Sequence, residues 1–221
     1  RVRKIDTDGM ITTIAGKGFA GFGGDNGPAT DVPIGFVAGL SINSVGDIFL
    51  SDRSNQCVRK VDHAFFQITT VAGICTPLGG YSGENVPAIT ALFRTPRGVA
   101  VNRNGEILIA DTENHRVRKV TTNGIVTTIA GTGAIGFSGE SGIAIDAKLD
   151  NPTSVTETNN GEIVIIDNGS RKIRKVDKNG IITTIAGNGI SGFGGDGGLA
   201  LCIITRCTRS CCDGGWGRIT G

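Results

Sequence analysis

The sequence predicts an all-β fold made of tandem four-stranded antiparallel units. One observation is a string of the form [Val/Ile]-Arg-Lys-[Ile/Val], which begins at residues 2, 58, 117 and 173. Each copy is followed by a Thr-Thr-[Ile/Val]-Ala-Gly string and then by a glycine-rich segment. The composition agrees, since 36 of the 221 residues are glycine and the apolar runs are dominated by Val, Ile and Thr. Such a chain forms short strands joined by tight turns.

The best-preserved copy contains four strand-sized segments, at residues 98–101, 107–111, 116–120 and 125–130. Asn-Gly pairs at 104–105 and 123–124 supply the positive φ angles that tight hairpins need. Tandem units of this kind predict β-propeller blades. A helical solenoid is not supported, because no copy spaces its apolar residues three and four apart.

The string PRGVAVNRNGEILIADTENHRVRKV, residues 96–120, resembles an NHL repeat, the unit of mostly six-bladed propellers. The TTIAG and GFGGDGG strings are similar to the longer NHL units of teneurin-like cell-surface proteins. The resemblance covers most of residues 1–198 and implies about three and a half blades of a partial propeller. We expect a half blade at 1–16 and blades at about 35–73, 95–131 and 151–187. The repeat averages about 57 residues, and its surplus over ordinary blades follows the TTIAG strand.

The repeat pattern stops after Leu199. Residues 199–221 hold four of the six cysteines, Cys202, Cys207, Cys211 and Cys212, without the paired spacing of a zinc knuckle. A genuine Cys-rich tail and a slip of the reading frame both remain open. The loss of periodicity directly after an intact GFGGDGG string favours the frame slip.

In a propeller of this kind the GVAV-type strand is innermost and the TTIAG strand outermost. The a–b and c–d hairpins lie on one face, and the b–c loops and long d-to-a connections lie on the other. Loops carry function more often than strands, so we expect binding on this loop-rich face. The candidate binding residues are Asp25, Asn26, Arg53, Asn55, Glu84, Glu113, Asn114, Glu140, Asn168 and Asp196.

An Asp ends each second strand, seven residues before an Arg in the third strand. These residues are Asp52 and Arg59, Asp111 and Arg118, and Asp167 and Arg174. Recurrence in every copy favours a structural role, either as an ion pair or as an Asx-type turn, because a catalytic site needs to occur only once. The Arg-Lys pairs are interpreted as solvated strand charges that discourage edge pairing.

These patterns favour a non-catalytic scaffold that binds a protein. RNA binding is a second hypothesis, but 22 basic residues are nearly balanced by 20 acidic ones and no aromatic residues interleave them. A metal-dependent hydrolase or lyase is a third, but His63 and His115 are the only histidines and neither belongs to an inner strand. Asp25, Asn26, Asp31 or Asp196 carry oxygen donors suited to calcium, yet their spacing fits no EF-hand loop.

We therefore expect no metal, no cofactor and no membrane insertion in this segment. The first residue is Arg1, and the chain is interpreted as a fragment. Asn168-Gly169-Ser170 forms a glycosylation sequon, and the teneurin-like resemblance suggests an extracellular or cell-surface location.

Overall fold

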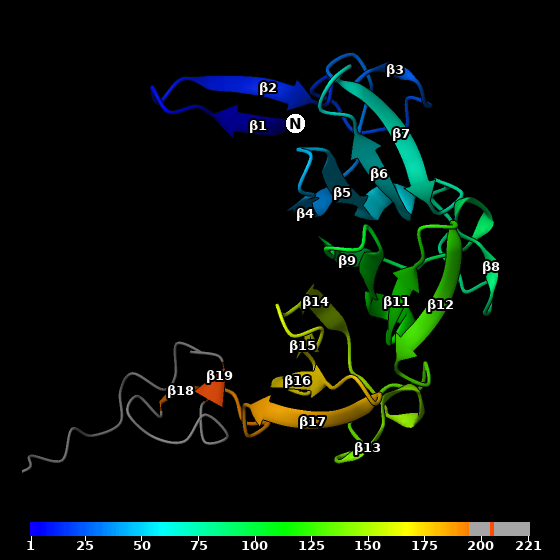
Figure 1. Cartoon of the computed structure of the whole chain (residues 1–221), viewed down its shortest axis with the longest axis vertical. Coiled ribbons are helices and arrows are strands. Elements are labelled where there is room, and N and C mark those ends of the chain that lie inside the picture. Colours follow the sequence, from blue (N-terminus) through cyan, green and yellow to red (C-terminus); the bar gives the residue numbers. More distant parts are fainter. Residues whose placement is uncertain (195–203, 206–221) are drawn as a thin grey trace, which may run out of the picture.

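The computed structural model describes residues 1–194 and 204–205. Three five-stranded antiparallel sheets, blades 1 to 3, follow one another along an arc (Figure 1). A two-stranded hairpin precedes blade 1, and a pair of two-residue strands follows blade 3. The predicted all-β propeller architecture is confirmed.

The elements follow the sequence pattern in order. The hairpin consists of β1 (Val2–Ile5) and β2 (Ile11–Ala15). Blade 1 contains β3 (Gly27–Pro28), β4 (Val37–Ile42), β5 (Ile48–Asp52), β6 (Cys57–Val61) and β7 (Gln67–Ala72). Blade 2 contains β8 (Val86–Pro87), β9 (Pro96–Val101), β10 (Ile107–Asp111), β11 (Arg116–Val120) and β12 (Ile125–Ala130). Blade 3 contains β13 (Gly142–Ile143), β14 (Pro152–Glu157), β15 (Ile163–Asp167), β16 (Lys172–Val176) and β17 (Ile181–Ala186). The remaining elements are β18 (Phe193–Gly194), β19 (Ile204–Thr205) and the short 3-10 turns η1 (Arg53–Asn55), η2 (Ala88–Thr90), η3 (Thr112–Asn114) and η4 (Ala144–Asp146).

The TTIAG strand is not the outermost strand, which corrects the prediction of four strands per blade. In blade 2 the order is β8-β12-β11-β10-β9, so the two-residue strand β8 lies outside β12. Strands β3 and β13 take the same place in blades 1 and 3. The glycine-rich segment supplies this strand, and its two residues were too few to show a strand pattern in the sequence.

The long connections between blades, residues 16–36, 73–95 and 131–151, are called straps 1 to 3. Straps 2 and 3 each touch two blades, and strap 1 touches the β1–β2 hairpin and blade 1. In strap 2, η2 packs against β7 of blade 1, while β8 pairs with β12 of blade 2. The strap folds back on its own start, where the Gly73 N–H donates to the Ala88 carbonyl at 2.8 Å. The surplus length of the repeat therefore joins neighbouring blades.

The hydrophobic core is divided between the blade junctions. The cluster between blades 1 and 2 joins Phe49 and Val58 of blade 1 to Val120 and Val126 of blade 2. Strap 2 closes the same cluster with Ala88, Ala91 and Phe93, which are almost completely buried. A second cluster lies between blades 2 and 3, and a third lies between the β1–β2 hairpin and blade 1. Every junction thus buries a strap together with two sheets.

We predict that Phe93→Ala destabilises the chain by about 3–5 kcal/mol, because it leaves a cavity where strap 2 meets two blades. Urea unfolding measures the loss. Phe65→Ala is the matched control, since Phe65 is 78% exposed, and we expect about 0.5 kcal/mol or less. Equal losses in the two variants would contradict the strap's place in the core.

Candidate functional site: the straps and the loop-rich face

A completely buried arginine stands at the centre of each blade's contact with its strap. Arg59, Arg118 and Arg174 have no exposed side-chain surface. Each is the Arg of an Arg-Lys pair in the third strand, and alternation along the strand places the two side chains on opposite faces of the sheet. The arginine therefore points toward the strap, and the lysine points away from it.

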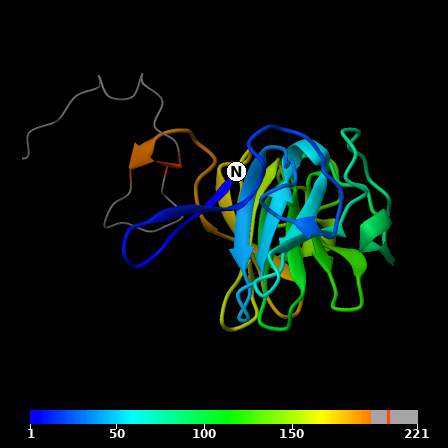
Figure 2. The same cartoon turned by 90° about the horizontal axis from the view of Figure 1, so that it is seen from above.

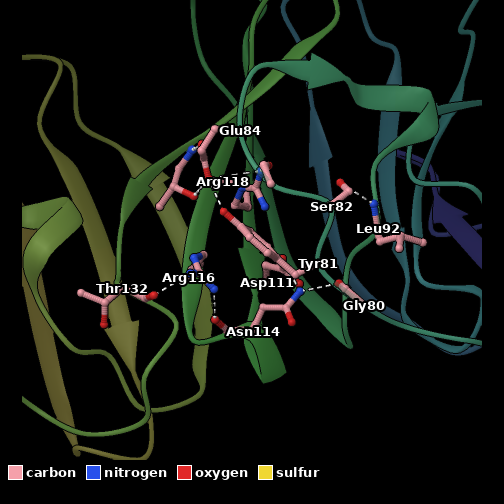
Figure 3. Close-up of polar contacts among 12 residues, drawn as sticks. Gly80, Tyr81, Ser82, Glu84, Leu92, Asp111, Asn114, Arg116, Arg118 and Thr132 are labelled. Atoms are coloured by element: carbon pink, nitrogen blue, oxygen red, sulfur yellow. Dashed lines mark hydrogen bonds and ion pairs between the residues drawn. The ribbon is translucent and has the colours of Figure 1, made fainter.

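In blade 2 the Arg118 guanidinium is enclosed by strap 2 (Figure 3). Its Nη2 donates to the Gly83 carbonyl at 2.5 Å and lies 3.7 Å from the Glu84 carboxylate. The Tyr81 ring covers it, with its centroid 4.8 Å from Cζ. One cation is thus held by a carbonyl, a carboxylate and an aromatic face, all from one short strap segment.

Glu84 ties the same strap segment to strand β12. It accepts hydrogen bonds from the Thr128 N–H at 2.5 Å and the Thr128 hydroxyl at 2.6 Å, and the Tyr81 hydroxyl donates to it at 2.5 Å. Burial raises the pKa of Glu84, but the bonds from Thr128 and Tyr81 and the charge of Arg118 outweigh burial and lower it overall. The carboxylate therefore remains charged and holds both the arginine and β12.

The arrangement recurs in the other blades, and we call it the arginine clasp. The acidic residue lies 34 positions before its arginine in all three copies, and the aromatic residue lies three positions before the acid. Asp25 pairs with Arg59 at 3.0 Å, and Glu140 faces Arg174 at 3.7 Å. The covering rings are Phe22 and Phe137, at 4.8 Å and 4.6 Å from the guanidinium carbon.

The Asp that ends each second strand holds the far end of the strap. The Asp111 carboxylate accepts from the Arg94 N–H at 2.7 Å and from Asn114 Nδ2 at 2.8 Å. Asp52 accepts from the Gly35 N–H, and Asp167 accepts from the Asp150 N–H. These contacts fit the turn-holding alternative. In the described part of the chain these aspartates make no ion pair within 4.0 Å with the arginines seven residues later.

The interpretation of the Arg-Lys pairs as solvated charges is wrong for the blades. The arginines are buried in the clasps, and the lysines are paired with acids at the start of the second strand. Lys119 lies 3.0 Å from Glu106, Lys175 lies 2.7 Å from Glu162, and Lys60 lies 3.5 Å from Asp47. These partners lie outside the strand that carries the pair, so the strand pattern alone does not reveal them.

The candidate binding residues divide into two groups. Asp25, Glu84 and Glu140 belong to the clasps, and Asn55 and Asn114 donate to the strap carbonyls of Gly21 and Gly80.

The other candidates lie at the surface or outside the residues that the structure describes. Asn26, Glu113 and Asn168 are exposed, and Glu113 pairs with Arg94 at 3.1 Å. Half-buried Arg53 lies over the Phe36 ring. Asp196 and the Cys-rich tail fall outside the described residues, apart from β19.

A disulfide between Cys57 and Cys75 fixes the start of strap 2. In the other copies a basic side chain takes the place of Cys57. It holds the start of the strap by donating to a strap carbonyl instead. Arg116 Nη2, for example, donates to the Thr132 carbonyl at 2.5 Å and lies against Gly133. Gly133 has a φ of +87°, and a Cβ there would overlap the guanidinium. The sequence contains a signal for this disulfide. The two positions that Arg116 and Gly133 occupy in blade 2 are both cysteine in blade 1.

In each copy an exposed apolar residue follows the TTIAG strand within a few residues of its end, in straps 1 to 3 and in the segment after β17. These tip residues are Phe19, Leu78, Ile135 and Ile190, with exposed fractions of 59%, 77%, 62% and 62%. Side-chain turns shape the segments that carry them. The Leu78 N–H donates to the Thr76 hydroxyl at 3.3 Å, and the Ile190 N–H donates to Asn188 Oδ1 at 2.9 Å. The loop-rich face thus presents apolar side chains on ordered turns.

Neither histidine joins a cluster suited to a metal ion. His63 lies in the β6–β7 turn beside Asp47, and His115 Nδ1 accepts from the Asn151 N–H at the junction of blades 2 and 3. Within residues 1–194 and 204–205 no group of three or more His, Cys, Asp or Glu side chains has metal-binding geometry. Over the same described range, no helix has the length and apolar character needed to span a bilayer.

The NHL repeat family model matches residues 93–120. Teneurin-1 of Mus musculus is 26% identical over 206 residues, which cover 80% of this chain and 7% of teneurin-1. NHL repeat-containing protein 2 of Gallus gallus is 36% identical over 118 residues, which cover 52% of this chain and 15% of that protein. The chain therefore spans only a small part of these relatives.

Solved structures share the fold at low sequence identity. A protein of unknown function from Bacteroides thetaiotaomicron matches with a TM-score of 0.59 at 16% identity, covering 77% of this chain and 40% of that chain. A gluconolactonase from Xanthomonas campestris matches with a TM-score of 0.50 at 12% identity, covering 72% and 50%. Identities this low support the fold alone, and a fold hosts enzymes and binding modules alike.

We predict that Arg118→Met lowers the free energy of unfolding by about 2 kcal/mol or more, because it removes the charged hydrogen bond to strap 2. Lys119→Met is the matched control. Its pair with Glu106 is partly solvated, so we expect a loss of about 1 kcal/mol or less. Urea unfolding measures both. A larger loss in the lysine variant would contradict the clasp.

The contribution of Asp111 to stability should fall as the pH rises from about 4 to about 7. Burial raises the pKa of Asp111 to about 7, although hydrogen bonds from Arg94 and Asn114 and the charge of Arg118 oppose it. The folded carboxyl keeps its proton up to about pH 7, whereas the unfolded one loses it near pH 3.8. At Asp111 the folded state binds more protons across this window, so this group's contribution to the free energy of unfolding decreases with pH.

Asp167 acts in the same direction up to about pH 6. Urea unfolding across the window tests this, and Asp111→Asn should flatten the decrease. An unchanged slope in that variant would exclude Asp111 as its source.

Proposed function

Because the chain belongs to the NHL-repeat β-propellers, we propose that it forms part of a scaffold that binds a protein partner through its loop-rich face. The observation that carries this proposal is the exposed apolar tip residue that follows every TTIAG strand: Phe19, Leu78, Ile135 and Ile190. The clasps account for one acid and one aromatic residue of each strap, but no contact of the core accounts for the tips. Exposed apolar side chains that recur in the same segment of every copy are typical of a surface that a partner covers.

The fixed conformation of the strap turns supports the same proposal. Strap 2 is held by the disulfide at its start, by the clasp in its middle and by Asp111 at its end. A surface fixed before binding loses less conformational entropy when a partner arrives. Leu78, near the start of strap 2, is therefore presented on a rigid support.

A protein partner is favoured over RNA by the use of the basic side chains. The three clasp arginines are buried, and Lys60, Lys119 and Lys175 are paired with acids. RNA binding requires basic groups that can reach phosphates. The enzyme alternative has no comparable support, because the histidines take part in a turn and a blade junction.

The disulfide also indicates the kind of compartment in which the protein acts. Disulfides persist in secreted and cell-surface proteins and are rare in reducing compartments. Cys57 and Cys75 are both buried, and their bond replaces a contact that other copies make without cysteine. We therefore place the protein in an oxidising compartment, where its partner is a secreted or cell-surface protein.

We predict that the combined variant Leu78→Ser, Ile135→Ser and Ile190→Ser loses the partner. The protein is screened as a multivalent bait against secreted and cell-surface domains, and each bound domain is titrated with wild type and variant. Each buried aliphatic side chain contributes on the order of 1–2 kcal/mol, so losing one weakens binding roughly tenfold. Unfolding of the variant should be unchanged, because the three side chains are largely exposed.

The control variant changes the opposite face, with Val45→Ser and Phe65→Ser, which are 59% and 78% exposed in wild type. It should bind as wild type does. The proposal fails if the tip variant retains full affinity for the domains that bind wild type, or if the control loses them.

A further inference from the structure

The β1–β2 hairpin repeats the pair of strands that β11 and β12 form in blade 2. Arg3 pairs with Thr13 and Ile5 with Ile11, with a register shift after Val2. Strands β11 and β12 show the same register and the same shift, with Arg118 opposite Thr128 and Val120 opposite Val126. The hairpin therefore carries the blade's half of an arginine clasp.

The hairpin differs from the blades in what covers it. Ile11 is 53% exposed, whereas its equivalents Ile68, Val126 and Ile182 are completely buried. Arg3 is exposed, whereas the three clasp arginines are buried. Within the described residues β1 and β2 form a sheet of two strands, with no strap along β2 (Figure 2). The hairpin therefore has an uncovered face. It contains the apolar side chain of Ile11, the cation of Arg3 and the unpaired edge of β2.

The blades show what fits such a face. In blade 2 the Asn85 N–H donates to the Val126 carbonyl at 3.0 Å, and the Ala88 N–H donates to the Gly124 carbonyl at 2.7 Å. Glu84 accepts from the Thr128 N–H. The equivalent groups of the hairpin are the carbonyls of Ile11 and Gly9 and the N–H of Thr13. All three described straps share an aromatic residue, an acid three positions later and an alanine seven positions later.

We propose that the β1–β2 hairpin is a docking site for a further strap segment of this kind, with its acid on Arg3 and Thr13 and its backbone along β2. Straps 1 to 3 are each bonded to their own blade, so none can supply the occupant without opening a blade. The occupant is therefore a strap from an NHL repeat other than these three. Its acid matches the exposed Arg3, and its backbone matches the open edge of β2.

A synthetic peptide with the sequence of residues 134–148 serves as the probe, titrated into the ¹⁵N-labelled chain. We expect a saturable downfield shift of the Thr13 amide, because an acid accepts from the equivalent N–H of Thr128 and Thr184. Arg3→Gln in the chain, or Glu140→Gln in the peptide, should weaken binding at least about tenfold. Lys4→Gln is the matched control, since Lys4 points to the other side of β1.

The outcomes separate clearly. Saturable shifts at Thr13 that depend on Arg3 and on the peptide's acid support the site. No saturable shift at Thr13, equal binding by the Arg3→Gln variant, or shifts confined to Thr128 and Thr184 would overturn it. The last result would mean that the peptide displaces an existing strap. The amide spectrum itself reports whether each variant is folded.

Discussion

The arginine clasp is the interaction on which the rest of the structure depends. A fully buried guanidinium is costly unless its charge and its donors are matched, so the strap must bring an acid and a carbonyl to it. In blade 2 strap 2 brings Glu84 and the Gly83 carbonyl, and the Tyr81 ring excludes water from the outer side. The strap cannot leave without stranding that cation. The long connection is thereby fixed along the blade, and the fold gains a fifth strand.

The same constraint explains how neighbouring blades are joined. A propeller blade contacts its neighbours through apolar faces, and each junction here includes at least one alanine and a large apolar residue of a strap. The clasp positions the strap, and the strap then closes the junction from the outer rim. Residues that recur in every copy account for this architecture. The residues that remain exposed, above all the strap tips, are the ones available for a partner.

The periodic part of the fold was predictable, and the contacts between distant segments were not. The apolar runs and the Asn-Gly turns at 104–105 and 123–124 identify the strands and hairpins, because these are local properties of the chain. Strand β8 escaped prediction because two residues carry no periodicity. Arg118 looked like a surface charge, because the acid that faces it lies in a glycine-rich segment 34 residues earlier. Alignment of the copies against one another does contain that signal, as it does for Cys57 and Cys75.

Native-state hydrogen exchange tests most directly whether the strap belongs to the folded core. The informative amides are those of Asn85 and Ala88 in strap 2, which donate to blade 2, and that of Thr128, which donates to Glu84. The clasp predicts that these amides exchange with the same opening free energy as strands β10 and β11, because the strap cannot open without breaking the junction. Strap amides that exchange through a much smaller opening free energy, while β10 and β11 stay protected, would show that the strap is peripheral and would contradict this account.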